Sequence, residues 1–188
     1  MRKRDENKVK AIREAVINLC AADGFTNLTT AKVAKLAGVS PATIYLNYQD
    51  KTDMLSRLYE EVKDDLHKGL AGAIAAAGDD LEAQLRATLR FSITQAQEHP
   101  KESHFVSALW TNQELLDDAA RAYGQTAAGP LLQLYQRIAA APDFVDAPEV
   151  TVASLATVPV LILQTANAAV DDPTLNQAID MIVKALKK

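Results

Sequence analysis

The sequence lacks the features that mark most secreted and membrane proteins. Its single cysteine, Cys20, cannot form an internal disulfide bond, which suits a reducing cytoplasm. We expect it to be a small buried hydrophobe rather than a redox sensor. The N-terminal MRKRDENK has no apolar segment of the kind found in signal peptides. The longest apolar run, residues 150–169, is interrupted by polar residues and predicts a buried helix rather than a membrane span. We therefore expect a cytoplasmic protein with no membrane partner.

Patterns that would indicate catalysis are also missing. The three histidines, His67, His99 and His104, are scattered without metal-ligand spacing. There is no phosphate loop, GxSxG or GxGxxG pattern, and the paired aspartates suit helix ends or a solvated surface. We predict no catalytic residues, no metal and no cofactor, and a small helical enzyme is kept only as an alternative.

Charge is distributed unevenly along the chain, whose net charge is −4. Residues 1–51 carry a net charge of +4, whereas residues 52–188 carry −8. A phosphate backbone would attract the first segment and repel the second, which would orient the molecule on DNA. Five basic residues near the N-terminus form either an arm along the phosphates or an ordinary solvated end: Arg2, Lys3, Arg4, Lys8 and Lys10.

Residues 28–51, LTTAKVAKLAGVSPATIYLNYQDK, have the pattern of a helix-turn-helix. Thr29 can cap a short helix, and Gly38 supplies the left-handed corner that follows it. Ser40 can cap a second helix that has Pro41 at its first position. Between the helices, Ala34 allows a close crossing, and Val39 with Ile44 fills the remaining space.

This segment resembles the tetracycline-repressor (TetR) family of transcription regulators. The resemblance is carried by Gly24-Phe25, Thr29-Thr30, Ala34, Ala37-Gly38-Val39-Ser40, Thr43, Tyr45, Tyr48 and Lys51, within the first quarter of the chain. Leu46-Asn47 and Tyr48 depart from the residues that members often carry there, so the resemblance implies how the protein docks on DNA but not which operator it prefers. It also implies a dimer, a palindromic operator and a small-molecule effector whose identity the sequence does not give.

The N-terminal end of the second helix of such a motif enters the major groove. We therefore predict that these residues contact double-stranded DNA: Thr30, Ser40, Pro41, Ala42, Thr43, Tyr45, Leu46, Asn47 and Lys51. The amide of Asn47 matches the edge of adenine, Tyr45 and Lys51 suit phosphates, and Thr43 suits either a phosphate or a thymine methyl group. No arginine lies on this helix, so specificity would depend on methyl contacts and DNA shape.

The remaining chain reads as helices without a convincing strand pattern. We predict an all-α fold of about nine helices, with a DNA-binding domain in residues 1–51 and a ligand-binding and dimerisation domain in residues 52–188. The fourth helix starts at a cap on Asp50, joins the two domains and ends at Gly78; Gly69 and Gly72 within it either let it bend or serve close packing. A seventh helix over residues 113–141 should kink or break at Gly129-Pro130.

Two final helices, residues 149–169 and 173–186, are more apolar than packing within one subunit requires. We predict that these eighth and ninth helices form a homodimer through a four-helix interface; the alternative is that they only close their own domain. The resemblance places an effector site among aromatic residues of the middle helices, which could equally be core: Phe91, Phe105, Trp110, Tyr123 and Tyr135. Few charges fall on these helices' inner faces, so we expect a small apolar effector. A constitutive DNA-binding protein without an effector is the other alternative.

Overall fold

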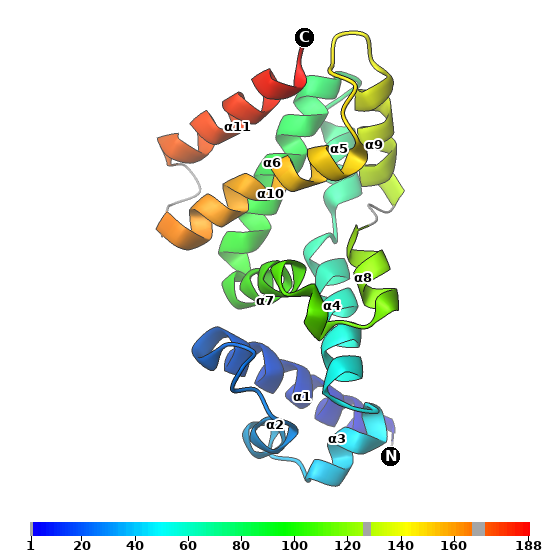
Figure 1. Ribbon diagram of the computed structural model, residues 1–188, viewed down its shortest axis with the longest axis vertical. Helices are drawn as coiled ribbons and strands as arrows, with labels where there is room; N and C mark the ends of the chain where they lie inside the picture. Colours follow the sequence, from blue (N-terminus) through cyan, green and yellow to red (C-terminus); the bar gives the residue numbers. More distant parts are fainter. Residues whose placement is uncertain (1, 126–128, 167–171) are drawn as a thin grey trace. The chain divides into compact units, whose positions relative to one another are not determined.

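We analysed a computed structural model of the chain, which describes the backbone of residues 2–125, 129–166 and 172–188. Over these ranges the chain forms eleven α-helices and one 3-10 helix, joined by short loops (Figure 1). Its only extended pairing within the described residues is an isolated bridge between Phe144 and Lys187. The predicted all-α class is confirmed. No helix among the described residues is long and apolar enough to cross a membrane.

The chain divides into two compact units, which we call unit 1 and unit 2. Unit 1 contains residues up to Lys63 and residues Lys101–Ala122, and unit 2 contains Asp64–Pro100 and Tyr123–Lys188. The predicted division of function at residue 51 stays a prediction, and unit 1 as a compact body extends well beyond that position.

Unit 1 contains the first three helices, most of α4 and most of a later helical segment. The elements are α1 (Arg2–Asp23), α2 (Thr30–Ala37), α3 (Pro41–Asn47), α4 (Lys51–Leu66), α7 (Pro100–Thr111), the 3-10 helix η1 (Gln113–Leu115) and the first part of α8 (Asp118–Gln125). The rings of Phe25 and Phe105 pack at 5.9 Å between centroids, which joins the α1–α2 loop to α7. Lys101 Nζ also donates to Asn18 Oδ1 on α1 at 2.7 Å.

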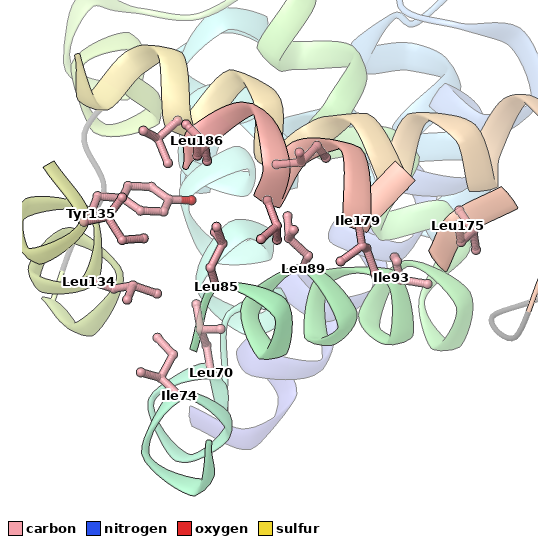
Figure 2. Packing of buried hydrophobic residues seen from close by; sticks show 14 of the residues in the cluster. Leu70, Ile74, Leu85, Leu89, Ile93, Leu134, Tyr135, Leu175, Ile179 and Leu186 are labelled. Carbon is pink, nitrogen blue, oxygen red and sulfur yellow. The ribbon is translucent and has the colours of Figure 1, made fainter. Parts of the chain in front are cut away.

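Unit 2 is built around helix α6 (Leu81–Glu98). Its other elements are α5 (Leu70–Ala76), α9 (Gly129–Ala140), α10 (Glu149–Ala166) and α11 (Pro173–Leu186). Figure 2 shows the side chains of α5, α6, α9 and α11 that gather in one buried cluster, among them Leu85, Leu89 and Ile179. The cluster is aliphatic apart from the rings of Tyr135 and Phe144.

The predicted single helix from Asp50 to Gly78 is wrong, because two helices, α4 and α5, occupy this stretch. Gly69 has a φ of 93°, which no residue inside a right-handed α-helix adopts. Just before it, the amides of His67 and Lys68 bond to carbonyls three residues back, Asp64 and Asp65, as in a tightened final turn. Gly69 therefore starts a new helix instead of bending a continuous one.

The predicted helix over residues 113–141 is also divided. It comprises η1, α8 and α9, and residues 126–128 lie outside the described part. Asp117 caps the start of α8 by accepting the Ala120 N–H at 2.8 Å. The predicted break at Gly129-Pro130 coincides with the start of α9. These two divisions explain why the described residues form more than the nine helices expected.

Candidate DNA interface

The corner between α2 and α3 has the geometry that the sequence predicts. Thr29 Oγ1 accepts the Lys32 N–H at 3.2 Å and caps α2. Gly38 has φ 65° and ψ 31°, and the next residue, Val39, donates its N–H to Ala34 O at 3.0 Å. This is a left-handed helix end that satisfies the last carbonyls of α2. The chain thereby turns directly into α3.

Helix α3 is held at its start by a second cap. Ser40 Oγ accepts the Thr43 N–H at 3.2 Å, and Pro41 occupies the first turn. With seven residues the helix is too short to be stable alone, so packing must hold it. Ile44 supplies that packing, because it is the one residue of α3 that is fully buried.

The C-terminal end of α3 is fastened to α4 by a residue that sequence analysis missed. Arg57 Nη1 donates to the backbone carbonyl of Asn47 at 2.6 Å. Its guanidinium lies 5.0 Å from the ring centroid of Tyr48 and forms a 3.9 Å ion pair with Asp53. A cation at a helix C-terminus also interacts favourably with the helix dipole. Arg57 is therefore a positioning residue for α3.

Two further contacts complete this junction. Asp50 caps α4, as predicted, by accepting the Asp53 N–H at 2.9 Å. The Asp53 carboxylate in turn accepts the Gln49 N–H at 2.8 Å. Burial raises the pKa of the Tyr48 hydroxyl, with Arg57 opposing that shift, so Tyr48 stays neutral at physiological pH. The side chains of Asp50 and Asp53 thus hold the short link between α3 and α4.

The predicted DNA-contacting residues all lie in unit 1. Five of them are exposed, namely Ser40, Pro41, Ala42, Tyr45 and Leu46, and four are partly buried, namely Thr30, Thr43, Asn47 and Lys51. Across the two helices, Thr30 Oγ1 lies 3.2 Å from the Tyr45 hydroxyl. Within α3, Ser40 Oγ lies 3.0 Å from Thr43 Oγ1. Their roles towards DNA stay predictions.

Asn47 and Lys51 both have partners inside the protein. Asn47 Nδ2 donates to Thr43 O, one turn back on α3, at 2.8 Å. Lys51 Nζ donates to Phe25 O at 3.0 Å and holds the α1–α2 loop. The bond from Asn47 to Thr43 uses one of the two N–H groups of Asn47 Nδ2 and fixes the orientation of the amide that bidentate reading of adenine would need. Replacing Lys51 would disturb the fold of unit 1 as well as any phosphate contact.

The N-terminal basic cluster is only partly described. The side chains of Arg2, Lys3 and Arg4 lie outside the described residues. Lys10 is exposed and forms a 3.9 Å pair with Glu14 one turn along α1. Its role as an arm on DNA stays a prediction.

The five residues predicted to bind an effector do not fall in one unit. Phe105 and Trp110 belong to unit 1, where Phe105 is fully buried against Phe25. Phe91, Tyr123 and Tyr135 belong to unit 2. The ring of Phe91 packs beside Gly69, and the Tyr123 hydroxyl donates to Asp64 Oδ1. Tyr135 lies in the aliphatic cluster of Figure 2.

Comparison with known proteins agrees with this geometry. Residues 12–58 match the model of the family described as bacterial regulatory proteins, tetR family. The fatty acid metabolism regulator protein of Bacillus subtilis is 36% identical over 59 residues, covering 31% of this chain and 30% of that protein. The nucleoid occlusion factor SlmA of Sodalis glossinidius is 28% identical over 138 residues, covering 71% of this chain and 65% of that protein. Both matches span less than two thirds of the relative's length.

Solved structures match over nearly the whole chain. A TetR family transcription regulator from Marinobacter aquaeolei VT8 has a TM-score of 0.83 at 24% identity, with 100% of both chains covered. A tetR family transcription regulator from Shewanella sp. PV-4 has a TM-score of 0.78 at 18% identity, covering 96% of this chain and 98% of that one. These likenesses establish the fold, and the family model identifies the helix-turn-helix segment. Residues 12–58 therefore match the tetR family of bacterial regulatory proteins, and the chain as a whole has the fold of solved tetR family transcription regulators.

Proposed function

We propose that the protein binds a palindromic operator as a homodimer and that a small apolar effector releases it. The observation that supports this most directly is the outward surface of α3, which is held by caps at both ends and carries the exposed residues Pro41, Ala42, Tyr45 and Leu46. A two-fold dimer would place two such helices in successive major grooves, about 34–36 Å apart.

The surface of α10 supports dimerisation through α10 and α11. Five exposed residues recur at helical spacing on one face of α10, namely Val150, Ser154, Thr157, Leu161 and Thr165, and none carries a charge. The three hydroxyls donate to carbonyls of their own helix at 2.7–2.8 Å, so their donors already have partners when the face is buried. Met181 adds an exposed apolar side chain on α11. Such a face suits contact with a second copy.

The core of unit 2 supports an apolar effector. Tyr135 is 3% exposed, and burial raises the pKa of its hydroxyl well above the ordinary value, with Glu149 adding to the shift. The aliphatic side chains around this ring would favour a mostly apolar molecule.

The chain path supplies the coupling between effector and DNA. Helix α4 begins four residues after α3 and continues without a break to Leu66, past the boundary between the units at Lys63. An effector that binds better to one position of α4 must change DNA affinity, and DNA must change effector affinity by the same factor. A coupling of about 1–3 kcal/mol, or roughly 5–150-fold in affinity, is ordinary for such systems.

The test begins with selection of an operator from random duplexes by the purified full-length protein. Light scattering then gives the mass of the free protein, and thermal shifts against a library of apolar compounds identify a ligand. We expect a dimeric mass, a palindromic selected sequence and weaker operator binding with a saturating ligand. A monomer would refute the dimer. An operator affinity that no stabilising ligand changes would favour the constitutive DNA-binding alternative.

A further inference from the structure

We propose that Leu46, flanked by Ala42, reads the 5-methyl group of a thymine in each operator half-site. The inference rests on DNA binding by α3 as proposed above, and it names the chemical group that α3 selects. It starts from the geometry of α3. Ala42 and Leu46 each lie two residues from the buried Ile44, hence about 160° around the helix from it. They occupy the centre of the outward face.

Exposure agrees with this placement. Leu46 is 84% exposed, more than any other exposed large hydrophobic residue of the described chain. Tyr45, on one flank, is 58% exposed, whereas Thr43 and Asn47, on the other flank, are partly buried. A helix that enters the major groove with this face forward presents an isobutyl group and a methyl group to the base edges.

The polar groups of the motif are already engaged with one another. The hydroxyls of Ser40 and Thr43 lie 3.0 Å apart, and those of Thr30 and Tyr45 lie 3.2 Å apart. Asn47 donates to the carbonyl of Thr43, so its amide follows the α3 backbone. None of these groups lies in the middle of the outward face, and residues 41–47 include no charged side chain.

Only one base-edge feature in the major groove is apolar, namely the C5-methyl group of thymine. A leucine side chain placed against a guanine or cytosine edge would cover hydrogen-bonding groups without replacing their water partners. Against thymine it would bury a methyl group with no such loss. Leu46 therefore favours a T·A pair at the position that faces it.

The experiment measures the interaction between one protein side chain and one DNA methyl group. Operators selected by the wild-type protein are resynthesised with deoxyuridine in place of each thymine in turn, symmetrically in both half-sites, which removes only the methyl group. When uracil replaces one particular thymine, wild-type protein should bind about fourfold more weakly per half-site, which is the factor expected for burial of a single methyl group. In an operator with a C·G pair at that position, 5-methylcytosine in place of cytosine should restore part of the affinity that the change from thymine to cytosine removes.

Leu46→Ala should bind the thymine and uracil operators equally, and Leu46→Met should keep part of the discrimination. Leu36→Ala is the matched control, because Leu36 is an exposed leucine of the same motif, on α2. It should leave the discrimination unchanged. Circular dichroism melts verify that each variant is folded.

Two results would overturn the inference. One is a selected operator at which no uracil substitution weakens wild-type binding. The other is a methyl dependence that survives in folded Leu46→Ala, since another residue would then make the contact. Failure to select any operator would instead refute the proposed DNA binding itself.

Discussion

Arg57 offers the sharpest test of how α3 is held, because its contacts can be removed without replacing any residue that is predicted to contact DNA. Arg57→Ala removes a 2.6 Å hydrogen bond to Asn47 O, a cation–π contact with Tyr48 and a 3.9 Å ion pair with Asp53. Arg57→Lys keeps the charge but loses the planar guanidinium that makes the first two contacts together.

The magnitude follows from these three contacts. A hydrogen bond from a charged group contributes about 1.5–3 kcal/mol in a protected site, and the 59% exposure of the Arg57 side chain reduces that. A cation–π contact at an exposed site adds about 0.5–1 kcal/mol. The exposed ion pair adds a few tenths, about 0.3–0.5 kcal/mol. We expect the alanine variant to lose about 1–2 kcal/mol in the free energy that keeps α3 docked, with the lysine variant in between.

Hydrogen exchange and DNA binding report this loss separately. The Tyr48 N–H, which bonds to Ile44 O at 2.9 Å, should exchange roughly 5–30-fold faster in Arg57→Ala if exchange occurs through local opening of α3. DNA affinity should fall while the slope of binding against salt concentration stays unchanged. Lys63→Ala removes the same charge from α4 beside a different ring, that of Tyr59, and should leave both measurements unchanged.

A different outcome would refute the positioning role. If exchange at Tyr48 is unaffected and the salt slope falls by about one unit, Arg57 contacts a phosphate and does not position α3. Equal effects of Arg57→Ala and Lys63→Ala would instead indicate a general loss of positive charge.

Three further predictions concern the dimer, the corner and the core. Leu161→Glu should dissociate the dimer, as measured by sedimentation or light scattering. Gln133→Glu, at an exposed position on α9, is the control and should leave the dimer intact. A dimer that survives Leu161→Glu would exclude α10 from the interface. Gly38→Ala should lower the free energy of unfolding in urea by about 1–2 kcal/mol because of the left-handed backbone alone, since a Cβ added at Gly38 would have no neighbouring atom within 4 Å. Gly72→Ala, inside α5, should instead raise the free energy of unfolding by about 0.5–1 kcal/mol. Burial raises the pKa of the Cys20 thiol to about 12 from 9.0, so wild-type stability should fall as pH rises from 9 towards 12 because the unfolded thiol ionises first. Cys20→Ala should show a smaller fall over that range, and an identical pH profile would contradict this account.

The features that sequence analysis predicted correctly depend on residues close together in the chain. The caps at Thr29, Ser40 and Asp50 each bond to an amide three residues ahead, so residue type and spacing suffice to find them. The left-handed corner at Gly38 is equally local.

The break between α4 and α5 shows where periodicity fails. Leu58, Val62, Leu66 and Leu70 keep helical spacing across it, so the apolar pattern predicts a continuous helix. A glycine in such a pattern is compatible with either a bend or a stop. The structure shows a stop, with a positive φ at Gly69 and the Phe91 ring beside it.

Contacts between residues that are distant in the sequence leave no local pattern from which they can be predicted. Phe25 and Phe105 are eighty residues apart, and their packing places α7 in unit 1. A buried aromatic residue on an amphipathic helix looks the same whether it faces an effector or another ring. The family resemblance therefore places Phe105 in an effector site, although its aromatic partner in the structure, Phe25, belongs to the loop before α2.

Asn47 and Lys51 show a related difficulty for predicting binding residues from side-chain chemistry. Both carry groups that suit DNA, and both use those groups inside unit 1, on the carbonyls of Thr43 and Phe25. The bond to Thr43 uses one of the two N–H groups of Asn47 Nδ2 and fixes the amide's orientation, so a contact with a base must either fit that orientation or give up a hydrogen bond worth about 0.5–1.5 kcal/mol. Leu46 has no internal bond to give up, and burying it against a methyl group removes apolar surface from water on both partners. On this protein the aliphatic side chain is therefore better prepared to select a base than the amide next to it.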